Sequence, residues 1–184
     1  MKKLKLVIPG LIILGLIIFS IVNIQNEKKS MIDVISSENY DDFKSLYLSL
    51  ENKDTYVDED GTLIPFIGWS LLVNDSRFFD LIVMYADPNS LLDPSSDVSK
   101  SVIFITSTFC AVDKAKKLIS RGANVNVSFE GFTLLHYVAG TKCYPLAKLF
   151  IEHGANKRAL NKDGLSPSEF AAKNGNIKMS EILK

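Results

Sequence analysis

Two histidines and two cysteines are the side chains in this 184-residue sequence most often used for catalysis or metal binding. No pair of His, Cys or Glu residues has the spacing of a metal site, and the acidic cluster "DEDG" falls in a predicted turn where carboxylates are solvated. There is no phosphate-binding glycine loop and no G-x-S-x-G nucleophile motif. The sequence therefore predicts no enzyme activity, no catalytic residue, no cofactor and no metal.

Charge is unevenly distributed along the chain. The 21 basic and 21 acidic residues give a net charge of zero, so the total does not indicate nucleic acid binding. Ser30 to Asp97, however, contains 14 acidic and 3 basic residues, whereas Val98 to Lys184 contains 6 acidic and 13 basic residues. Residues 30–184 are therefore expected to form a strong electrical dipole.

The segment 1–26 has the pattern of an export signal. The lysine-rich start "MKKLK" precedes 19 mostly apolar residues, Leu6 to Ile24, close to the ~20 that span a bilayer. An uncleaved transmembrane signal anchor, a cleaved signal peptide and a buried soluble helix are the alternatives. Cleavage after Ser20 is disfavoured because Ile18 is not small. The lysines before the run favour a cytoplasmic N-terminus and an extracytoplasmic body, secreted if the signal is cleaved.

The rest of the chain repeats itself. The phrases "RGANVN" and "HGANKR" place Gly122 and Gly154 32 residues apart, and Gly131 and Gly164 are 33 apart. A period near 33 residues, with a turn followed by two helical segments, is typical of a stacked repeat array. Such an array buries its apolar faces only between neighbouring units.

On these residues the chain resembles the ankyrin repeat family. "GFTLLHYVA" is similar to the family's G-x-T-P-L-H-x-A-A, with Leu134 in place of proline, and "AKLFIEHGAN" is similar to V-x-L-L-L-x-x-G-A-D. "DGLSPSEFAAKNGN" keeps Ser166 and Pro167 at the Thr-Pro positions but has Glu169 where His is usual. The resemblance implies an all-α solenoid of four to five helix-turn-helix repeats over 30–184. Their approximate bounds are 30–60, 61–97, 98–129, 130–162 and 163–184.

Within the repeats, residue types indicate structural roles. Gly122 and Gly154 should end helices in a left-handed conformation, and Thr133 and Ser166 should cap first helices. His136 should hydrogen-bond to neighbouring backbone, and His153 should be exposed. Small residues should let helices approach and larger ones should fill the space between layers: Ala139, Ala171 and Ala172, then Leu135, Leu146, Leu149 and Phe150.

Cys110 and Cys143 both fall near turns between the two helices of adjacent repeats. In an oxidising compartment they could pair. A disulfide needs Cα atoms within about 7 Å, whereas stacked helices are spaced by roughly 10 Å. We therefore expect two buried free thiols, with a disulfide as the alternative.

The resemblance also implies a protein-binding surface, because ankyrin proteins usually hold partners with hairpin tips and the concave face of the first helices. The tips here would be "TYVDED", "DPSSD", "VSFE" and "LNKD". An aromatic anchor with surrounding carboxylates suits a basic partner. Trp69 could join this surface or pack in the core. The predicted partner-binding residues are Tyr56, Asp58, Glu59, Asp60, Asp93, Asp97, Phe129 and Glu130.

A small exported ankyrin domain is similar to bacterial immunity proteins that neutralise toxins, including periplasm-acting phospholipases. We therefore predict a membrane-anchored, extracytoplasmic inhibitor, monomeric when free, that binds a toxin and no nucleic acid. The alternative is an envelope scaffold or chaperone-like protein that localises or protects a periplasmic enzyme.

Overall fold

The structure is a computed structural model that describes residues 33–35, 37, 39–57, 63–93 and 100–184. The chain divides into two compact units, with the boundary between Ser49 and Leu50. In the first unit, helix α2 (Tyr40–Ser49) begins after Asn39. Asn39 Oδ1 accepts hydrogen bonds from the amides of Asp41 and Asp42, each at 3.1 Å. Phe43 and Tyr47, one turn apart, are buried, and their ring centroids lie 5.4 Å apart. The predicted signal segment 1–26 lies outside the described residues.

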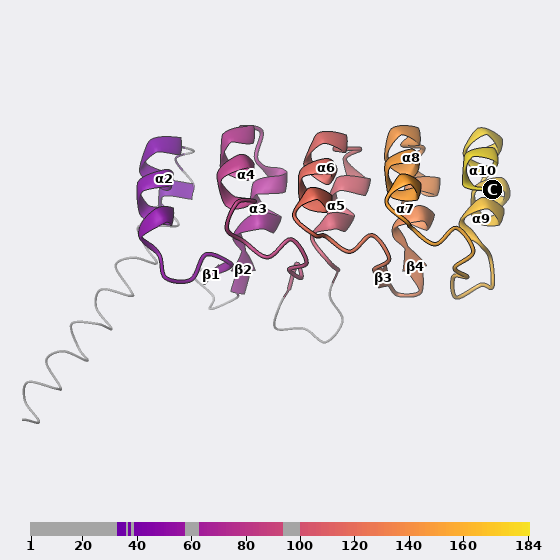
Figure 1. Cartoon of the computed structure of the whole chain (residues 1–184), viewed down its shortest axis with the longest axis horizontal. Coiled ribbons are helices and arrows are strands. Elements are labelled where there is room, and N and C mark those ends of the chain that lie inside the picture. The colour runs from indigo at the N-terminus through magenta and orange to yellow at the C-terminus, as the bar shows by residue number, and fades with distance from the viewer. Residues whose placement is uncertain (1–32, 36, 38, 58–62, 94–99) are drawn as a thin grey trace, which may run out of the picture. The chain divides into compact units, whose positions relative to one another are not determined.

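The second unit is built from pairs of short helices, which Figure 1 shows side by side. The described pairs are α3 (Phe66–Leu72) with α4 (Ser76–Ile82), α5 (Ile103–Thr108) with α6 (Val112–Ser120), α7 (Leu134–Thr141) with α8 (Tyr144–Glu152), and α9 (Pro167–Lys173) with α10 (Ile177–Leu183). First helices pack on first helices, α3 on α5, α5 on α7 and α7 on α9, while second helices α6, α8 and α10 pack in the same order. These two rows are the stack expected from the period.

Antiparallel hairpins precede two of the described first helices, so the predicted helical repeats also carry short paired strands. Strand β1 (Thr55–Val57) pairs with β2 (Leu63–Pro65) ahead of α3, and β3 (Ser128–Phe129) pairs with β4 (Phe132–Thr133) ahead of α7. Both hairpins extend from the same side of the helical rows in Figure 1. Their β-branched and aromatic residues favour extended backbone, which explains why these turns are paired strands.

The core follows the period closely. The predicted core residues that are at most 5% exposed are Leu135, Leu146, Leu149, Phe150, Ala139 and Ala171. Ala172 is the exception, because it is exposed. Successive residues point about 100° apart around a helix, so α9 turns Ala171 inward and Ala172 away from its neighbours.

Glycines end the second helices as predicted. Gly122 and Gly154 have φ of 94° and 84°, in the left-handed region. At Gly154 the amide donates to the Ile151 carbonyl at 3.0 Å, and the next amide, that of Ala155, donates to the Phe150 carbonyl at 2.9 Å. This pair of bonds is the Schellman motif, which satisfies carbonyls that the helix end would otherwise leave unpaired.

The predicted caps of the first helices are also confirmed. The Thr133 amide donates to His136 Nδ1 at 3.3 Å, and the Thr133 hydroxyl lies 2.9 Å from the same nitrogen. At α9 the Glu169 amide donates to Ser166 Oγ at 3.3 Å, and the Glu169 carboxylate accepts from the Ser166 amide at 2.8 Å. Glu169 therefore does in the last repeat what His136 does in the one before it, and the two positions form equivalent capping boxes.

Helix α3 is capped by a residue from the next repeat. Its last turn has no glycine, and the chain leaves it in extended conformation at Val73. The Lys114 ammonium of α6 donates to the carbonyls of Ser70 at 3.2 Å and Leu71 at 3.0 Å. Burial lowers the pKa of Lys114, and the Asp80 carboxylate opposes that shift. A lysine thus satisfies carbonyls that a C-terminal glycine motif would otherwise pair.

Asparagine side chains join successive repeats. Asn89 Oδ1 accepts from the Asn124 amide at 2.8 Å, and Asn89 Nδ2 donates to the Gly122 carbonyl at 3.2 Å. One repeat later, Asn126 makes the same two bonds, to the Asn156 amide at 2.8 Å and the Gly154 carbonyl at 3.0 Å. Each asparagine therefore fixes the position of the next helix end.

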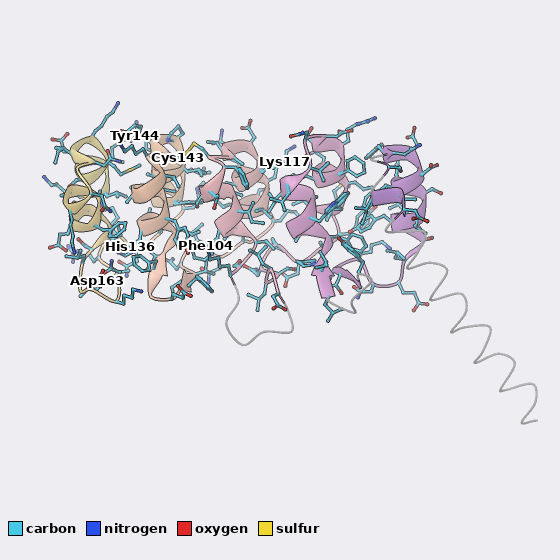
Figure 2. The ribbon with its side chains drawn as sticks, turned by 180° about the vertical axis from the view of Figure 1, so that it is seen from behind. Phe104, Lys117, His136, Cys143, Tyr144 and Asp163 are labelled. Atoms are coloured by element: carbon cyan, nitrogen blue, oxygen red, sulfur yellow. A yellow bond between two sulfur atoms is a disulfide. The ribbon has the colours of Figure 1, made fainter. Side chains whose placement is uncertain are left out.

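The expectation of free thiols is wrong. Cys110 and Cys143 form a disulfide, with Cα atoms 5.6 Å apart. The spacing of helix axes does not apply to them, because Cys110 lies in the turn after α5 and Cys143 directly precedes α8. Cys143 is buried, as predicted, but Cys110 is exposed and has a left-handed φ of 52°. Figure 2 shows Cys143 at the end of the helices that lies away from His136 and Phe104.

Candidate protein-binding surface

The predicted partner-binding residues are only partly within the described structure. Asp58, Glu59, Asp60 and Asp97 lie outside the described residues, whereas Tyr56, Asp93, Phe129 and Glu130 are described. Tyr56 belongs to β1, and Asp93 to the connection between α4 and α5. Phe129 and Glu130 are brought together in the β3–β4 hairpin.

The tip of the β3–β4 hairpin is tightly built. Glu130 and Gly131 form the turn, with φ of 50° and 80°. Two consecutive residues with positive φ are typical of the two-residue turns that match strand twist. A Cβ added to Gly131 would lie 3.3 Å from the Lys162 backbone nitrogen, so the hairpin tip abuts the turn that precedes α9. Glu130 is exposed at this tip, which places its carboxylate where a partner can reach it.

The aromatic residues of the first hairpin region pack on one another. The Tyr56 ring lies 5.0 Å from that of buried Phe66, measured between centroids. Tyr56 itself is half-buried. Trp69 is half-buried as well, and its ring meets Phe78 edge-on at 5.3 Å. Part of each ring is therefore used in packing, and part remains accessible.

A second aromatic group joins α5, the β3–β4 hairpin and α7. The Tyr137 ring of α7 packs against Phe104 of α5, with centroids 4.7 Å apart. The Lys100 ammonium lies over two rings, 4.7 Å from the Phe129 centroid and 5.1 Å from that of Tyr137. Phe129 and Tyr137 are both half-buried. Of these residues, only Phe129 was among those predicted to bind a partner.

The aromatic surface continues into the last repeat. Phe132 of β4 and Phe170 of α9 are half-buried, with ring centroids 5.6 Å apart. The Lys162 ammonium lies 5.5 Å from the Phe132 centroid. Like Tyr137 and Lys100, these residues were missed as candidate binding residues. The sequence does contain a pattern that indicates them, because aromatic residues recur on the hairpins and first helices of adjacent repeats. The predicted binding residues, however, were taken only from the hairpin tips.

Both histidines hydrogen-bond to backbone groups. His136 is 1% exposed, and since Nδ1 accepts the Thr133 amide hydrogen, Nε2 carries the proton and donates to the Leu165 carbonyl at 3.0 Å. Burial lowers the pKa of His136, and the bond to Leu165 opposes this shift. His153 is exposed, with Nδ1 2.8 Å from the Leu149 carbonyl. Both predictions for the histidines are confirmed.

Two absences apply to the described part of the chain. Nowhere in it do three or more His, Cys, Asp or Glu side chains gather in a way that could hold a metal ion. None of its helices has the length and apolar character needed to cross a bilayer.

Comparison with known proteins identifies the repeats. Residues 104–184, which run from α5 to the end of α10, match the family model for ankyrin repeats in three copies. These residues are ankyrin repeats. The helix pairs α5/α6, α7/α8 and α9/α10 are accordingly stacked ankyrin units, and ankyrin arrays act as protein-interaction modules. The resemblance read from "GFTLLHYVA" and "AKLFIEHGAN" is confirmed over this part of the chain.

The ankyrin repeats are also similar to part of a larger protein. The chain is 29% identical over 113 residues to the nuclear factor NF-kappa-B p105 subunit of Gallus gallus. The alignment covers 60% of this chain but only 12% of that protein.

Proposed function

We propose that this chain is a non-catalytic, protein-binding ankyrin module exposed outside the cytoplasm. In this proposal it is an immunity protein that binds and neutralises a toxin effector, such as a periplasm-acting phospholipase. The observation that supports extracytoplasmic exposure is the disulfide between Cys110 and Cys143, because disulfides form and persist in oxidising compartments. The lysine-led apolar run in residues 1–26 supports the same location and would tether the repeats to the membrane.

The partner in this proposal is a protein with a basic contact surface. Inhibition would follow from the hairpin side of the repeats covering the partner's active site in a 1:1 complex. Glu130 is exposed at the β3–β4 tip and Phe129 is half-buried beside it, which supplies one carboxylate and one aromatic contact. The free chain is proposed to be a monomer that binds no nucleic acid.

Affinity capture tests the proposed function. The full chain, tagged after Lys184, is recovered from membranes of the producing cells, and co-purifying proteins are identified by mass spectrometry. We expect a stoichiometric secreted hydrolase or toxin whose activity the chain inhibits. An envelope enzyme that stays active in the complex would instead support the scaffold alternative. The mass of the chain's own N-terminus distinguishes a cleaved signal from an anchor.

The redox state of the cysteines tests the location independently of the partner. Cells are treated with a thiol-alkylating reagent before lysis, and the chain is compared with its Cys110→Ser/Cys143→Ser variant. We expect the original chain to be unlabelled unless it is first reduced. Full labelling without reduction would place both thiols in a reducing compartment and contradict extracytoplasmic exposure.

A further inference from the structure

The rings of Phe129 and Tyr137 already hold a cation, and that cation belongs to the chain itself. The Lys100 ammonium lies within about 6 Å of both ring centroids, at 4.7 Å and 5.1 Å, which is the range of cation–π attraction. The β3 strand supplies one ring and α7 supplies the other, so the two walls come from separate elements. These distances show that the two rings can accommodate a positively charged side chain.

The site is supported from beneath and accessible from outside. Phe104, which is 2% exposed, packs against Tyr137 with ring centroids 4.7 Å apart and therefore limits its movement. Lys100, Phe129 and Tyr137 are each half-buried, so solvent reaches part of the site. Figure 2 labels Phe104 on the hairpin side of the helices, away from Cys143 and Tyr144. The aromatic site thus lies on the side from which the hairpins extend.

The side chain of Lys100 can be displaced while its backbone stays in place. The Lys100 carbonyl accepts a hydrogen bond from the Leu92 amide at 2.8 Å, which fixes the main chain. Its ammonium makes no ion pair with any described carboxylate. Among the contacts of the described residues, displacement therefore costs those with the two rings, and the ammonium regains solvation when it leaves.

The neighbouring charge favours a cation over an anion as the replacement. Glu130 follows Phe129 directly and is exposed at the hairpin tip. An incoming lysine or arginine can therefore combine ring contact with a nearby carboxylate, whereas an incoming acid would meet both the negative ring faces and Glu130. Arginine suits the site particularly well, because its planar guanidinium also stacks on aromatic rings.

We propose that Phe129 and Tyr137 form an anchor site for a lysine or arginine side chain of the partner protein, and that Lys100 occupies this site in the free chain. The inference rests on the proposed function in one respect, because it takes the partner to be a protein with a basic contact surface. Beyond that function, the inference identifies the residues that bind the partner's cationic side chain. It also implies that Lys100 and the partner compete for the same two rings.

A titration of the full chain in non-ionic detergent tests the site without the natural partner. The probe is a hexa-arginine peptide, with hexa-glutamate at the same ionic strength as the control, and the readout is the NMR shift of the Lys100 side-chain protons. We expect ring currents to shift these protons upfield in the free chain. Hexa-arginine should return them to the positions of a solvated lysine, and hexa-glutamate should not.

Substitutions at Lys100 and in the two rings measure the competition, with Lys148 as the control position. Lys100→Met removes the internal cation, so hexa-arginine should bind about two- to fivefold more tightly. Lys148→Met is the matched control, because Lys148 is an exposed lysine of α8, in the row of second helices, and its loss should leave binding unchanged. Phe129→Leu should weaken binding several-fold. Tyr137→Leu should also weaken binding, but it loses the contact with Phe104 and could fail to fold. Phe129→Leu tests the site in that case.

Lys100 shifts that do not respond to hexa-arginine would overturn the inference, and so would a Lys100→Met variant that binds no more tightly than the original chain. The captured partner separates this inference from the proposed function. A toxin whose affinity is unchanged by Lys100→Met and Phe129→Leu leaves the function standing and removes the anchor site. Displacement of Lys100 by hexa-arginine, with a captured partner that is no toxin, supports the site and removes the immunity proposal.

Discussion

The side chain of Lys114 caps the C-terminal end of α3, a helix of the preceding repeat. Its ammonium is the hydrogen-bond donor for carbonyls of the last turn of α3, at 3.0 Å and 3.2 Å. Lys114→Met keeps most of the apolar stem but removes the donor, so these half-buried carbonyls lose their partner. We expect the free energy of unfolding, measured by urea denaturation, to fall by about 1–3 kcal/mol.

The neighbouring lysine provides the control for Lys114. Lys116 lies on the same helix but is exposed, and its ion pair with Asp113 is long, at 3.8 Å. Lys116→Met should change the free energy of unfolding by no more than about 0.5 kcal/mol. Equal losses for the two variants would mean that the Lys114 bonds to α3 contribute nothing of their own.

His136 should make the stability of the repeats depend on pH. Burial lowers its pKa below the ordinary value of 6.5, so the unfolded chain binds more protons than the folded one once the pH falls below that value. Stability from this group is complete above pH 6.5 and is lost as the pH falls towards the folded pKa. Protonation of Nδ1 would also break the bond from the Thr133 amide, which is made at 3.3 Å.

Thermal unfolding between pH 7.5 and pH 5 tests this dependence. The original chain should melt at progressively lower temperature below pH 6.5, and His136→Gln should lose most of this slope while being less stable at neutral pH. The control is His153→Gln, which removes an exposed histidine and should keep the slope. A slope unaffected by His136→Gln would assign the pH dependence to other groups.

At the residue scale, the sequence predicted short-range contacts and missed long-range ones. The caps at Thr133 and Ser166 involve residues three positions apart, so local patterns indicate them. Lys114 lies 43 and 44 positions from its partners Leu71 and Ser70. Nothing local distinguishes it from the exposed lysines of the same helix, and only the packing of α6 against the end of α3 assigns its role.

At the scale of elements, the disulfide is the strongest link between two neighbouring repeats. It joins the α5–α6 turn to the α7–α8 turn across 33 residues. In the chain-entropy description, closing a loop of this length restricts the unfolded state by about 3–4 kcal/mol. The Cys110→Ser/Cys143→Ser variant should therefore be less stable by up to that amount in urea denaturation, with its helical circular dichroism unchanged.

Reduction of the original chain gives the matching measurement for the disulfide. A reductant should lower the urea midpoint of the original chain to near that of the double variant and leave the variant itself unaffected. If the original chain shows the same midpoint with and without reductant, the bond does not stabilise the repeats.

Element prediction succeeded where the period was clear and failed at the turns. The glycines at 122 and 154 placed the ends of α6 and α8, because a positive φ has few other solutions. The free-thiol prediction failed because it used the distance between helix axes for Cys110 and Cys143. Their Cα atoms lie at turns that approach to 5.6 Å. Hairpins were expected only as tips, since two-residue strands are too short to show alternation.

At the scale of the whole molecule, the distribution of charge bears on how a partner is found. Residues 30–97 contain 14 acidic and 3 basic side chains, whereas 98–184 contain 6 and 13. The ankyrin fold follows from periodicity and says nothing of the partner, which is why the fold of 104–184 was predictable whereas the contact residues stay a prediction. Charge is a separate signal, and it acts over distances longer than any single contact.

Charge reversal tests whether the acidic half steers the partner. The variant Asp58→Lys/Glu59→Lys/Asp60→Lys should bind the captured partner about tenfold more weakly, mainly through slower association, because a basic surface is no longer attracted to this segment. Its helical circular dichroism should be unchanged. The matched control, Asp113→Lys/Glu152→Lys/Glu181→Lys, changes net charge equally but on second helices. Association rates measured at several salt concentrations show whether the position of the charges or the net charge alone controls binding. Equal slowing by both variants would mean that net charge alone acts, and no slowing by the first would remove residues 58–60 from the contact.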